Sequence, residues 1–303
     1  MYKITQKFQL NTDTFSMWIE APLVANHAKA GQFIMLRVSE TGERIPLTIC
    51  DKNIKTGEVR IVFQAVGKTT IELAQKEKGE YLADFVGPLG APTHLPVGVD
   101  AHIDPSKSTK VLVIAGGLGT AIALPQVKEL YSRKIDTHAI LGFRNKDLII
   151  LEDEFKASTH EVIVATDDGS NGQKGFVTDV LQNLLQRGAR DGAPYALSEI
   201  NSAPYDSIIC IGPIPMMKAV CELTKKHDIP TIVSMNSTMI DGTGMCGCCR
   251  VTVGGEVKFA CVDGPDFDGH SVDFDEAMRR NNYFASEEKR AIEVHKCKLG
   301  DAK

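Results

Sequence analysis

The sequence has no long apolar run, few aromatic residues and no excess of positive charge. No stretch approaches the roughly 20 consecutive apolar residues that a membrane-spanning helix requires. Aromatic residues make up 6% of the 303 residues, and the net charge is −5. Because nucleic-acid-binding domains carry a basic patch or stripe, and a basic surface also draws proteins to anionic membranes, neither nucleic acid nor a membrane is an expected partner.

The chain also begins without the apolar core of a secretory signal, since its first residues are MYKITQKFQL. We therefore expect a cytoplasmic protein. Its eight cysteines would lie in a reducing compartment, where clustered cysteines are metal ligands more often than disulfides. With 43% hydrophobic residues and enough length for two cores, the chain is typical of a globular protein with two domains.

Residues 1–95 are predicted to form a small antiparallel β-barrel or sandwich. The segment GEVRIVFQAV alternates, so that Val59, Ile61, Phe63 and Ala65 share one face of a strand. Other short apolar runs, GQFIMLRV and RIPLTICD, are separated by turn-rich pieces. Residues 96–108 contain prolines and few large apolar residues, which predicts a linker.

Residues 109–235 alternate between buried strands and helices. The strands KVLVIA, DTHAILGF, HEVIVAT and SIICIG are interleaved with helical segments such as GFVTDVLQNLLQRG and IPMMKAVCELTKKH. This alternation predicts a parallel, doubly wound α/β sheet. A cysteine-rich segment at 236–265 and a polar tail at 266–303 follow the sheet.

The cysteine-rich segment has the spacing Asp241-x4-Cys246-x2-Cys249-x11-Cys261. Plant-type [2Fe–2S] sites use C-x4-C-x2-C followed by a distant cysteine, so this chain keeps the spacing and has an aspartate at the first position. The intervening glycines suit a tight loop around a cluster. The segment therefore predicts a [2Fe–2S] site with Asp241, Cys246, Cys249 and Cys261 as its four ligands.

Two other interpretations of this segment stay open. A structural zinc ion takes sulfur and nitrogen ligands tetrahedrally, and it could use Cys246, either Cys248 or Cys249, Cys261 and His270. Alternatively, Asp241 is a turn residue and Cys248 is the fourth cluster ligand. Since Cys248 and Cys249 are adjacent in sequence, binding of both to one small cluster would be strained, which favours Asp241.

Two glycine-containing loops indicate a dinucleotide site. Gly116, Gly117 and Gly119 in IAGGLGT lie between a strand and a helix, where backbone amides and a helix N-terminus can bind phosphate. Gly212 and Pro213 in CIGPIPMM follow another strand that ends at the same edge of the predicted sheet. Ligands of doubly wound sheets bind at that edge, so both loops are candidate nicotinamide dinucleotide sites.

A second pair of motifs lies in the predicted barrel. RIPLT is one, and VGKTTIEL combines a glycine, a cation and hydroxyls at a predicted helix start, which suits a pyrophosphate. Taken singly, VGKTTIEL would be interpreted as a surface turn before a capped helix. The candidate cofactor-binding residues of the two motifs are Arg44, Pro46, Leu47, Thr48, Gly67, Lys68, Thr69 and Thr70.

The order of these motifs, RIPLT in a barrel, GGLG and IGPIPMM in a sheet, and then a cluster loop, resembles the ferredoxin–NADP reductase superfamily. Within it, the chain looks like the branch that holds the electron-transfer subunit of dihydroorotate dehydrogenase. The segment DGTGMCGCCRVTVGGEVKFACVDGPDFDGHSVDF is similar to the family of small subunits of NADH-dependent reduced ferredoxin:NADP+ oxidoreductase, also named sulfide dehydrogenase beta subunits. The resemblance covers essentially the whole chain.

The resemblance implies a ferredoxin reductase-type FAD domain, with the RIPLT residues along the flavin ring and Gly67, Lys68 and Thr69 near the pyrophosphate. It implies that the two glycine loops lie beside NAD(H) and that Asp241 and three cysteines hold the [2Fe–2S] cluster. It also implies a heterodimer with a larger flavin and iron–sulfur subunit, in which NADP(H) and ferredoxin react by electron bifurcation.

The residues themselves do not choose between NAD and NADP. Arg144 and Lys146 could bind a 2′-phosphate, whereas Glu152 and Asp153 could bind a ribose hydroxyl, and all four could equally be solvated loop charges. The resemblance favours NAD(H).

Three alternative functions share parts of this pattern. The electron-transfer subunit of dihydroorotate dehydrogenase shares the expected architecture, but its cluster loop is expected to carry four cysteines, so Asp241 argues against it. A self-contained ferredoxin reductase with a fused cluster would need no partner subunit. A zinc-stabilised nucleotide-binding regulator would bind neither flavin nor iron.

Overall fold

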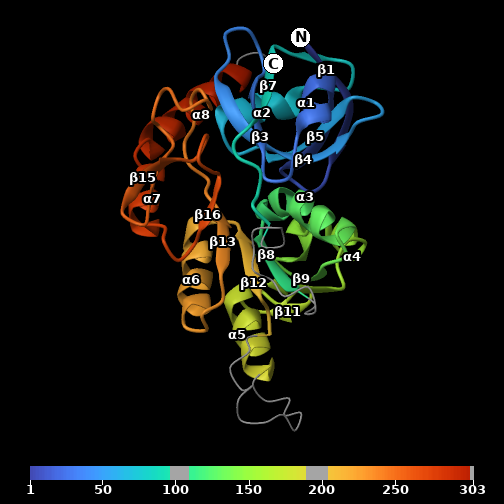
Figure 1. The fold of residues 1–303 in the computed structure, drawn as a ribbon. Coiled ribbons are helices and arrows are strands. Elements are labelled where there is room, and N and C mark those ends of the chain that lie inside the picture. The colour runs from blue at the N-terminus through green and yellow to red at the C-terminus, as the bar shows by residue number, and fades with distance from the viewer. Residues whose placement is uncertain (96–108, 189–203, 301–303) are drawn as a thin grey trace, which may run out of the picture. The chain divides into compact units, whose positions relative to one another are not determined.

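The computed structural model describes residues 1–95, 109–188 and 204–300, and the chain divides into two compact units (Figure 1). The barrel unit comprises Met1–Pro92, Asn236–Pro265 and Asp273–Lys303. The sheet unit comprises Thr93–Met235 and Asp266–Val272. The cysteine-rich segment therefore shares a unit with the barrel, and the predicted linker at 96–108 lies outside the described residues.

The barrel unit is built on antiparallel strands that curl into a nearly closed barrel. These are β1 (Tyr2–Gln9), β2 (Thr14–Glu20), β3 (Phe33–Arg37), β4 (Arg44–Asn53), β5 (Glu58–Gln64), β6 (Tyr81–Leu82) and β7 (Asp84–Leu89), with helices α1 (Pro22–His27) and α2 (Lys68–Gln75). The strand order is β6-β1-β2-β5-β4-β3-β7. Since the end strands β6 and β7 are separated in sequence by Ala83 alone, the sheet must bend back on itself, which confirms the predicted barrel (Figure 1).

The barrel core follows from the alternation of β5. Val59, Ile61 and Phe63 are fully buried on one face, as predicted, and they pack with Ile4 and Leu36 from other strands. Each such side chain contributes about 1.5–3 kcal/mol when it leaves water. Ala65 was predicted to continue this face, but it lies after the end of β5 and is half-buried.

The sheet unit is a parallel sheet with one antiparallel edge strand. Its strands are β8 (Lys110–Gly116), β9 (Asp136–Phe143), β10 (Glu161–Thr166), β11 (Gln173–Lys174), β12 (Ser207–Ile211), β13 (Thr231–Ser234) and β16 (Asp266–Asp268). The order is β11-β10-β9-β8-β12-β13-β16, and only the β13–β16 pair is antiparallel. The chain builds outward from β8 in one direction and from β12 in the other, so the topological switch point lies between these two strands. This confirms the predicted doubly wound fold.

The helices of the sheet unit also follow the predicted segments. They are α3 (Gly119–Ser132), the 3-10 helix η1 (Lys146–Leu148), α4 (Glu152–Lys156), α5 (Val177–Gly188) and α6 (Ile214–Lys225). Helix α3 continues through Pro125, although proline removes one helical hydrogen bond. Its buried face, which includes Leu124 and Val127, holds the helix on the sheet.

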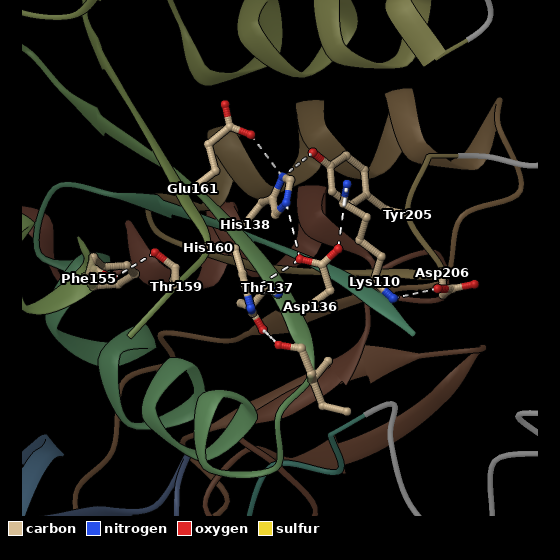
Figure 2. A network of polar contacts seen from close by, with 11 residues as sticks. Lys110, Asp136, Thr137, His138, Phe155, Thr159, His160, Glu161, Tyr205 and Asp206 are labelled. Atoms are coloured by element: carbon tan, nitrogen blue, oxygen red, sulfur yellow. Dashed lines mark hydrogen bonds and ion pairs between the residues drawn. The ribbon is translucent and has the colours of Figure 1, made fainter. Parts of the chain in front are cut away.

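Polar side chains tie the amino ends of the parallel strands together (Figure 2). Nδ1 of His138 lies 3.2 Å from Oε2 of Glu161 and 3.3 Å from the hydroxyl of Tyr205, and Nε2 lies 3.4 Å from Oδ1 of Asp136. The Nζ atom of Lys110 lies 3.8 Å from Oδ2 of Asp136. Burial lowers the pKa of His138, which favours the neutral imidazole. Because a neutral ring carries a single N–H, it can donate a hydrogen bond to only one of the two carboxylates, Asp136 or Glu161, whereas the contact of Lys110 with Asp136 is an ion pair. The network lies at the amino ends of the strands, whereas the glycine loops follow their carboxyl ends.

Residues 266–300, expected as a polar tail, are structured. After β16, the chain forms α7 (Phe274–Asn281) and α8 (Ala285–Gly300), which belong to the barrel unit with the hairpin of β14 (Arg250–Val253) and β15 (Glu256–Phe259). The Asp273 carboxylate caps α7 by accepting a hydrogen bond from the backbone amide of Glu276. Among the described residues, none of the helices has the length and apolar content to span a membrane.

Candidate functional site

The β14–β15 hairpin brings two cysteine side chains together. Cys249 precedes β14 and Cys261 follows β15, and the backbone amide of Ala260 donates a hydrogen bond to the carbonyl of Cys249. Both cysteines are buried, and their Sγ atoms lie 3.2 Å apart. That separation is too long for a disulfide bond of about 2.05 Å and close to the about 3.8 Å expected between two thiolates that bind one tetrahedral metal ion. The hairpin therefore brings the sulfurs of two predicted ligands together.

The loop before the hairpin is organised by Asp241. One carboxylate oxygen accepts a hydrogen bond from the amide of Thr243 at 2.7 Å, and the other accepts from the amide of Cys246 at 2.8 Å. These bonds, with that from Thr243 the strongest, lower the pKa of Asp241. Gly242 and Gly244 have φ angles of +76° and +87°, which favour glycine. Asp241 thus forms the turn that one alternative interpretation assigned to it, and it lies on the same loop as the exposed Cys246.

The predicted ligands are gathered in two pairs. Cys249 contacts Cys261, and Asp241 is joined to Cys246 through a backbone amide. In the described part of the chain, no three Cys, His, Asp or Glu side chains converge as a complete metal site. His270, the nitrogen ligand of the zinc alternative, belongs to the sheet unit and has its Nε2 atom 2.9 Å from the Thr224 hydroxyl.

The cluster loop packs onto the barrel at Gly242. A Cβ atom at this position would lie 2.6 Å from Cγ of Met35 in β3 and 3.1 Å from Cδ1 of Leu89 in β7. Met35 is paired with Pro46 of β4 across the sheet. The loop that carries Asp241 and Cys246 is therefore held one strand away from the predicted flavin-binding motif, within one compact unit.

The RIPLT motif lies on β4 and is incompletely covered. Ile45, Pro46, Leu47 and Thr48 are all half-buried, although strands on both sides flank them. The guanidinium of Arg44 is half-exposed and lies 3.4 Å from the Asp84 carboxylate. A strand with partly exposed apolar side chains and a cation at one end suits a planar, polar-edged ring such as the predicted flavin.

The VGKTTIEL motif forms the start of α2. The Thr70 hydroxyl accepts a hydrogen bond from the amide of Gly67 and donates one to its carbonyl, and the buried Thr69 hydroxyl donates to Oε2 of Glu43. Both hydroxyls thus form hydrogen bonds within the chain. The groups left for a phosphate are the backbone amides at the helix start and Lys68, which has no hydrogen bond or ion pair within the described ranges.

The two predicted dinucleotide loops meet at the switch point of the sheet unit. A Cβ atom at Gly116 or Gly212 would lie within 2.6 Å of the Met216 side chain, and one at Gly119 would lie 2.3 Å from the carbonyl oxygen of Ile211. Gly117 has a φ of +54° and open space beside it. The two loops therefore lie side by side at the carboxyl ends of β8 and β12, where they form the base of a candidate cradle, and Pro213 occupies the N-cap position of α6 there.

Some residues of these sites were not identified from the sequence. The Thr120 hydroxyl, in the first turn of α3, is buried and has no hydrogen-bond partner in the described residues. Met35 and Leu89 support the cluster loop, and Arg280 of α7 donates a hydrogen bond to the carbonyl of Cys248. Nothing in the sequence distinguishes Met35 and Leu89 from other strand residues, because their role depends on a long-range contact.

The comparisons with known proteins concern the cysteine-rich segment and the whole chain. Residues 236–273 match the family described as the iron–sulfur cluster binding domain of dihydroorotate dehydrogenase B. A Clostridium beijerinckii protein, described as an uncharacterized protein in the adh 3′ region, is 49% identical over 96% of this chain and 93% of its own. The Thermotoga maritima homologue of the dihydroorotate dehydrogenase B (NAD+) electron transfer subunit is 40% identical over 96% of this chain and 94% of its own.

Among solved structures, the chain is similar to one from the NADH-dependent reduced ferredoxin-NADP oxidoreductase, a structure described as giving insights into flavin-based electron bifurcation. The identity is 38%, the TM-score is 0.83, and 97% of each chain is covered. Sequence and structure therefore agree over almost the full length. This chain belongs to the family of dihydroorotate dehydrogenase B electron transfer subunits and their homologues, which are flavin iron–sulfur oxidoreductase subunits.

Proposed function

We propose that the chain is the electron-transfer subunit of a cytoplasmic, electron-bifurcating NADH-dependent reduced ferredoxin:NADP+ oxidoreductase. It would pass electrons between NAD(H) and a larger flavin and iron–sulfur subunit, with which it forms a heterodimer and through which NADP(H) and ferredoxin react. The observation that carries this proposal is the similarity to the chain of that enzyme over 97% of both lengths. The Thermotoga relative supports the alternative, an electron transfer subunit of dihydroorotate dehydrogenase, but Asp241 in place of a cysteine favours the first.

The residues fit the three cofactors of such a relay. The uncovered strand Arg44–Thr48 and the start of α2 would hold FAD, and Asp241, Cys246, Cys249 and Cys261 would hold the [2Fe–2S] cluster. The cradle of Gly116, Gly117, Gly119, Gly212 and Pro213 would hold NAD(H). When bound, FAD exchanges two electrons and a proton with the nicotinamide and single electrons with the cluster.

The protein's contribution is to position these groups and to shape their charge environment. The packing of Gly242 on Met35, the cross-strand partner of Pro46, holds the cluster loop beside the flavin-binding strand. Arg44 supplies a positive charge at the end of that strand. The Asp241 hydrogen bonds fix the loop between the first two ligands, and no side chain is required as a general acid or base.

The proposal is tested by anaerobic titration of the purified chain with NADH and, separately, with NADPH. We expect NADH to bleach the flavin absorbance and to produce the EPR signal of a reduced [2Fe–2S] cluster, and NADPH alone to act far more slowly. A colourless chain with stoichiometric zinc would contradict the proposal, and efficient reduction by NADPH alone would overturn the choice of NAD(H). Co-purification with an orotate-forming subunit would favour the dihydroorotate dehydrogenase alternative.

An apolar rim on the cluster segment supports the expected partner subunit. Ile240, Met245 and Val262 are exposed, with Met245 89% accessible, and a Cβ atom on the neighbouring Gly244 would lie 2.7 Å from Val262. Contiguous exposed apolar surface marks interaction sites, and these three side chains all belong to the cluster segment. We expect the partner subunit to cover this rim.

The Met245→Glu variant should therefore lose most of its partner while it keeps its own cofactors. A charge buried in an apolar interface is unfavourable by several kcal/mol, which corresponds to an affinity loss of at least about a hundredfold. The measurement is the ratio of the two subunits after affinity purification of this chain. Leu23→Glu, at an exposed apolar position on α1, is the matched control, and equal partner recovery with both variants would exclude the rim from the interface.

A further inference from the structure

Helix α7 holds the cluster segment at two places. Phe274 and Ala277 are buried on one face of the helix, and Arg280 follows at the next i+3 position on that face. Nη2 of Arg280 donates a hydrogen bond to the carbonyl oxygen of Cys248 at 3.1 Å, and Nδ2 of the adjacent Asn281 donates to the carbonyl of Asn236 at 2.7 Å. The helix end thus fixes both the start of the segment and the turn between the ligands Cys246 and Cys249.

Arg280 also borders a cavity that reaches the cluster loop. The cavity has a volume of about 350 Å³, and its lining includes Cys246, Cys248, Arg250 and Arg280. Arg250 is exposed and Arg280 is half-buried, so solvent screens the charge of Arg280 less. Within the described residues, Arg280 has no carboxylate partner, and its hydrogen bond to Cys248 leaves its charge uncompensated.

We propose that Arg280 is a positioning residue for the cluster, whose guanidinium fixes the Cys246–Cys249 turn and places a positive charge that favours the reduced cluster. The inference rests on the proposed [2Fe–2S] site. A [2Fe–2S] core with one carboxylate and three thiolate ligands is anionic, and it gains one more negative charge on reduction. A nearby cation stabilises the more negative state, and cluster potentials respond to net charge and to hydrogen bonding around the ligands.

The test compares two arginines of the same helix. Arg279 precedes Arg280 in the last turn of α7 and is exposed, so Arg279→Gln changes the net charge by the same amount without affecting the contact with Cys248. The full-length wild-type chain, Arg280→Gln, Arg280→Lys and Arg279→Gln are compared by an EPR-monitored redox titration, with iron and FAD content measured on each. The FAD content reports whether the barrel unit is folded.

We expect Arg280→Gln to make reduction of the cluster about tenfold less favourable, because it removes one nearby charge. For one electron this is a shift of about 59 mV to a more negative midpoint potential. Arg280→Lys, which keeps the charge, should shift the potential much less, and Arg279→Gln should match the wild type. Loss of iron from Arg280→Gln with full FAD content, while Arg279→Gln keeps its iron, would also support the positioning role.

The inference is overturned if Arg280→Gln keeps its iron and has the midpoint potential of Arg279→Gln, or a higher one. A wild-type chain that contains FAD but no iron–sulfur cluster would refute the proposed function instead. The two failures are therefore distinguishable, because only the second is seen without any substitution.

Discussion

Serine in place of Cys249 is expected to remove nearly all of the iron and acid-labile sulfide from the purified chain, whereas serine in place of Cys248 leaves both in place. Cys249 is buried with its sulfur 3.2 Å from that of Cys261, and a hydroxyl is a harder and more weakly ionised iron ligand than a thiol. Cys248 is half-buried beside a cavity. Iron and sulfide assays and the EPR spectrum of the reduced chain measure the difference.

The FAD content of both serine variants serves as the control. The flavin-binding candidates lie on β4 and α2, outside the cluster segment, so neither variant should lose flavin. If Cys248→Ser lost its iron and Asp241→Ala kept it, the fourth ligand would be Cys248, and Asp241 would act only through its hydrogen bonds to Thr243 and Cys246.

Alanine at Gly242 is expected to separate reduction of the flavin from reduction of the cluster. Its Cβ atom would lie 2.6 Å from Cγ of the buried Met35, and the φ of +76° disfavours any residue with a side chain. The backbone strain costs about 1–2 kcal/mol and the overlap about 1–3 kcal/mol, so the loop should move away from β3. In stopped-flow experiments with NADH, flavin bleaching should keep its wild-type rate while the cluster is reduced more slowly.

Gly254 provides a matched control for this experiment. It also has a positive φ, of +60°, but a Cβ atom there would meet nothing within 4 Å. Gly254→Ala therefore introduces backbone strain without pressing on a neighbour. If Gly242→Ala and Gly254→Ala transferred electrons to the cluster at the same rate, contact with the barrel would not set that rate.

Local patterns were sufficient to predict most of the two cores. The alternation of Val59, Ile61 and Phe63 identified β5, and the run DTHAILGF coincides with β9 at Asp136–Phe143. These segments bury one or both faces, so the spacing of their apolar residues predicts which side chains are buried. Helix α7 was not predicted because it is short and its sequence is largely polar, with Phe274 and Ala277 as its only buried residues.

The candidate sites were predictable to the extent that they depend on spacing. The interval between Cys249 and Cys261 allows a hairpin, and the hairpin places their sulfurs together. The hydroxyls of Thr69 and Thr70 were expected near a phosphate, yet they bind Glu43 and cap α2, because a hydroxyl can satisfy the backbone as readily as a ligand. The contact of Arg280 with Cys248 spans 32 residues, and no local pattern encodes it.

The pairing of β13 with β16 makes the cluster segment, residues 236–265, an insertion between two neighbouring strands of the sheet unit. Ser234 and Asp266 are direct partners in that antiparallel pair. The chain therefore leaves the sheet and returns to it at the same place, before and after residues 236–265. In topological terms the segment is a very long hairpin loop, and a two-residue turn is enough to join antiparallel strands. The same sheet could therefore exist with or without a metal centre, and exchange of this one loop would alter the redox chemistry of the chain while its nucleotide cradle stayed unchanged.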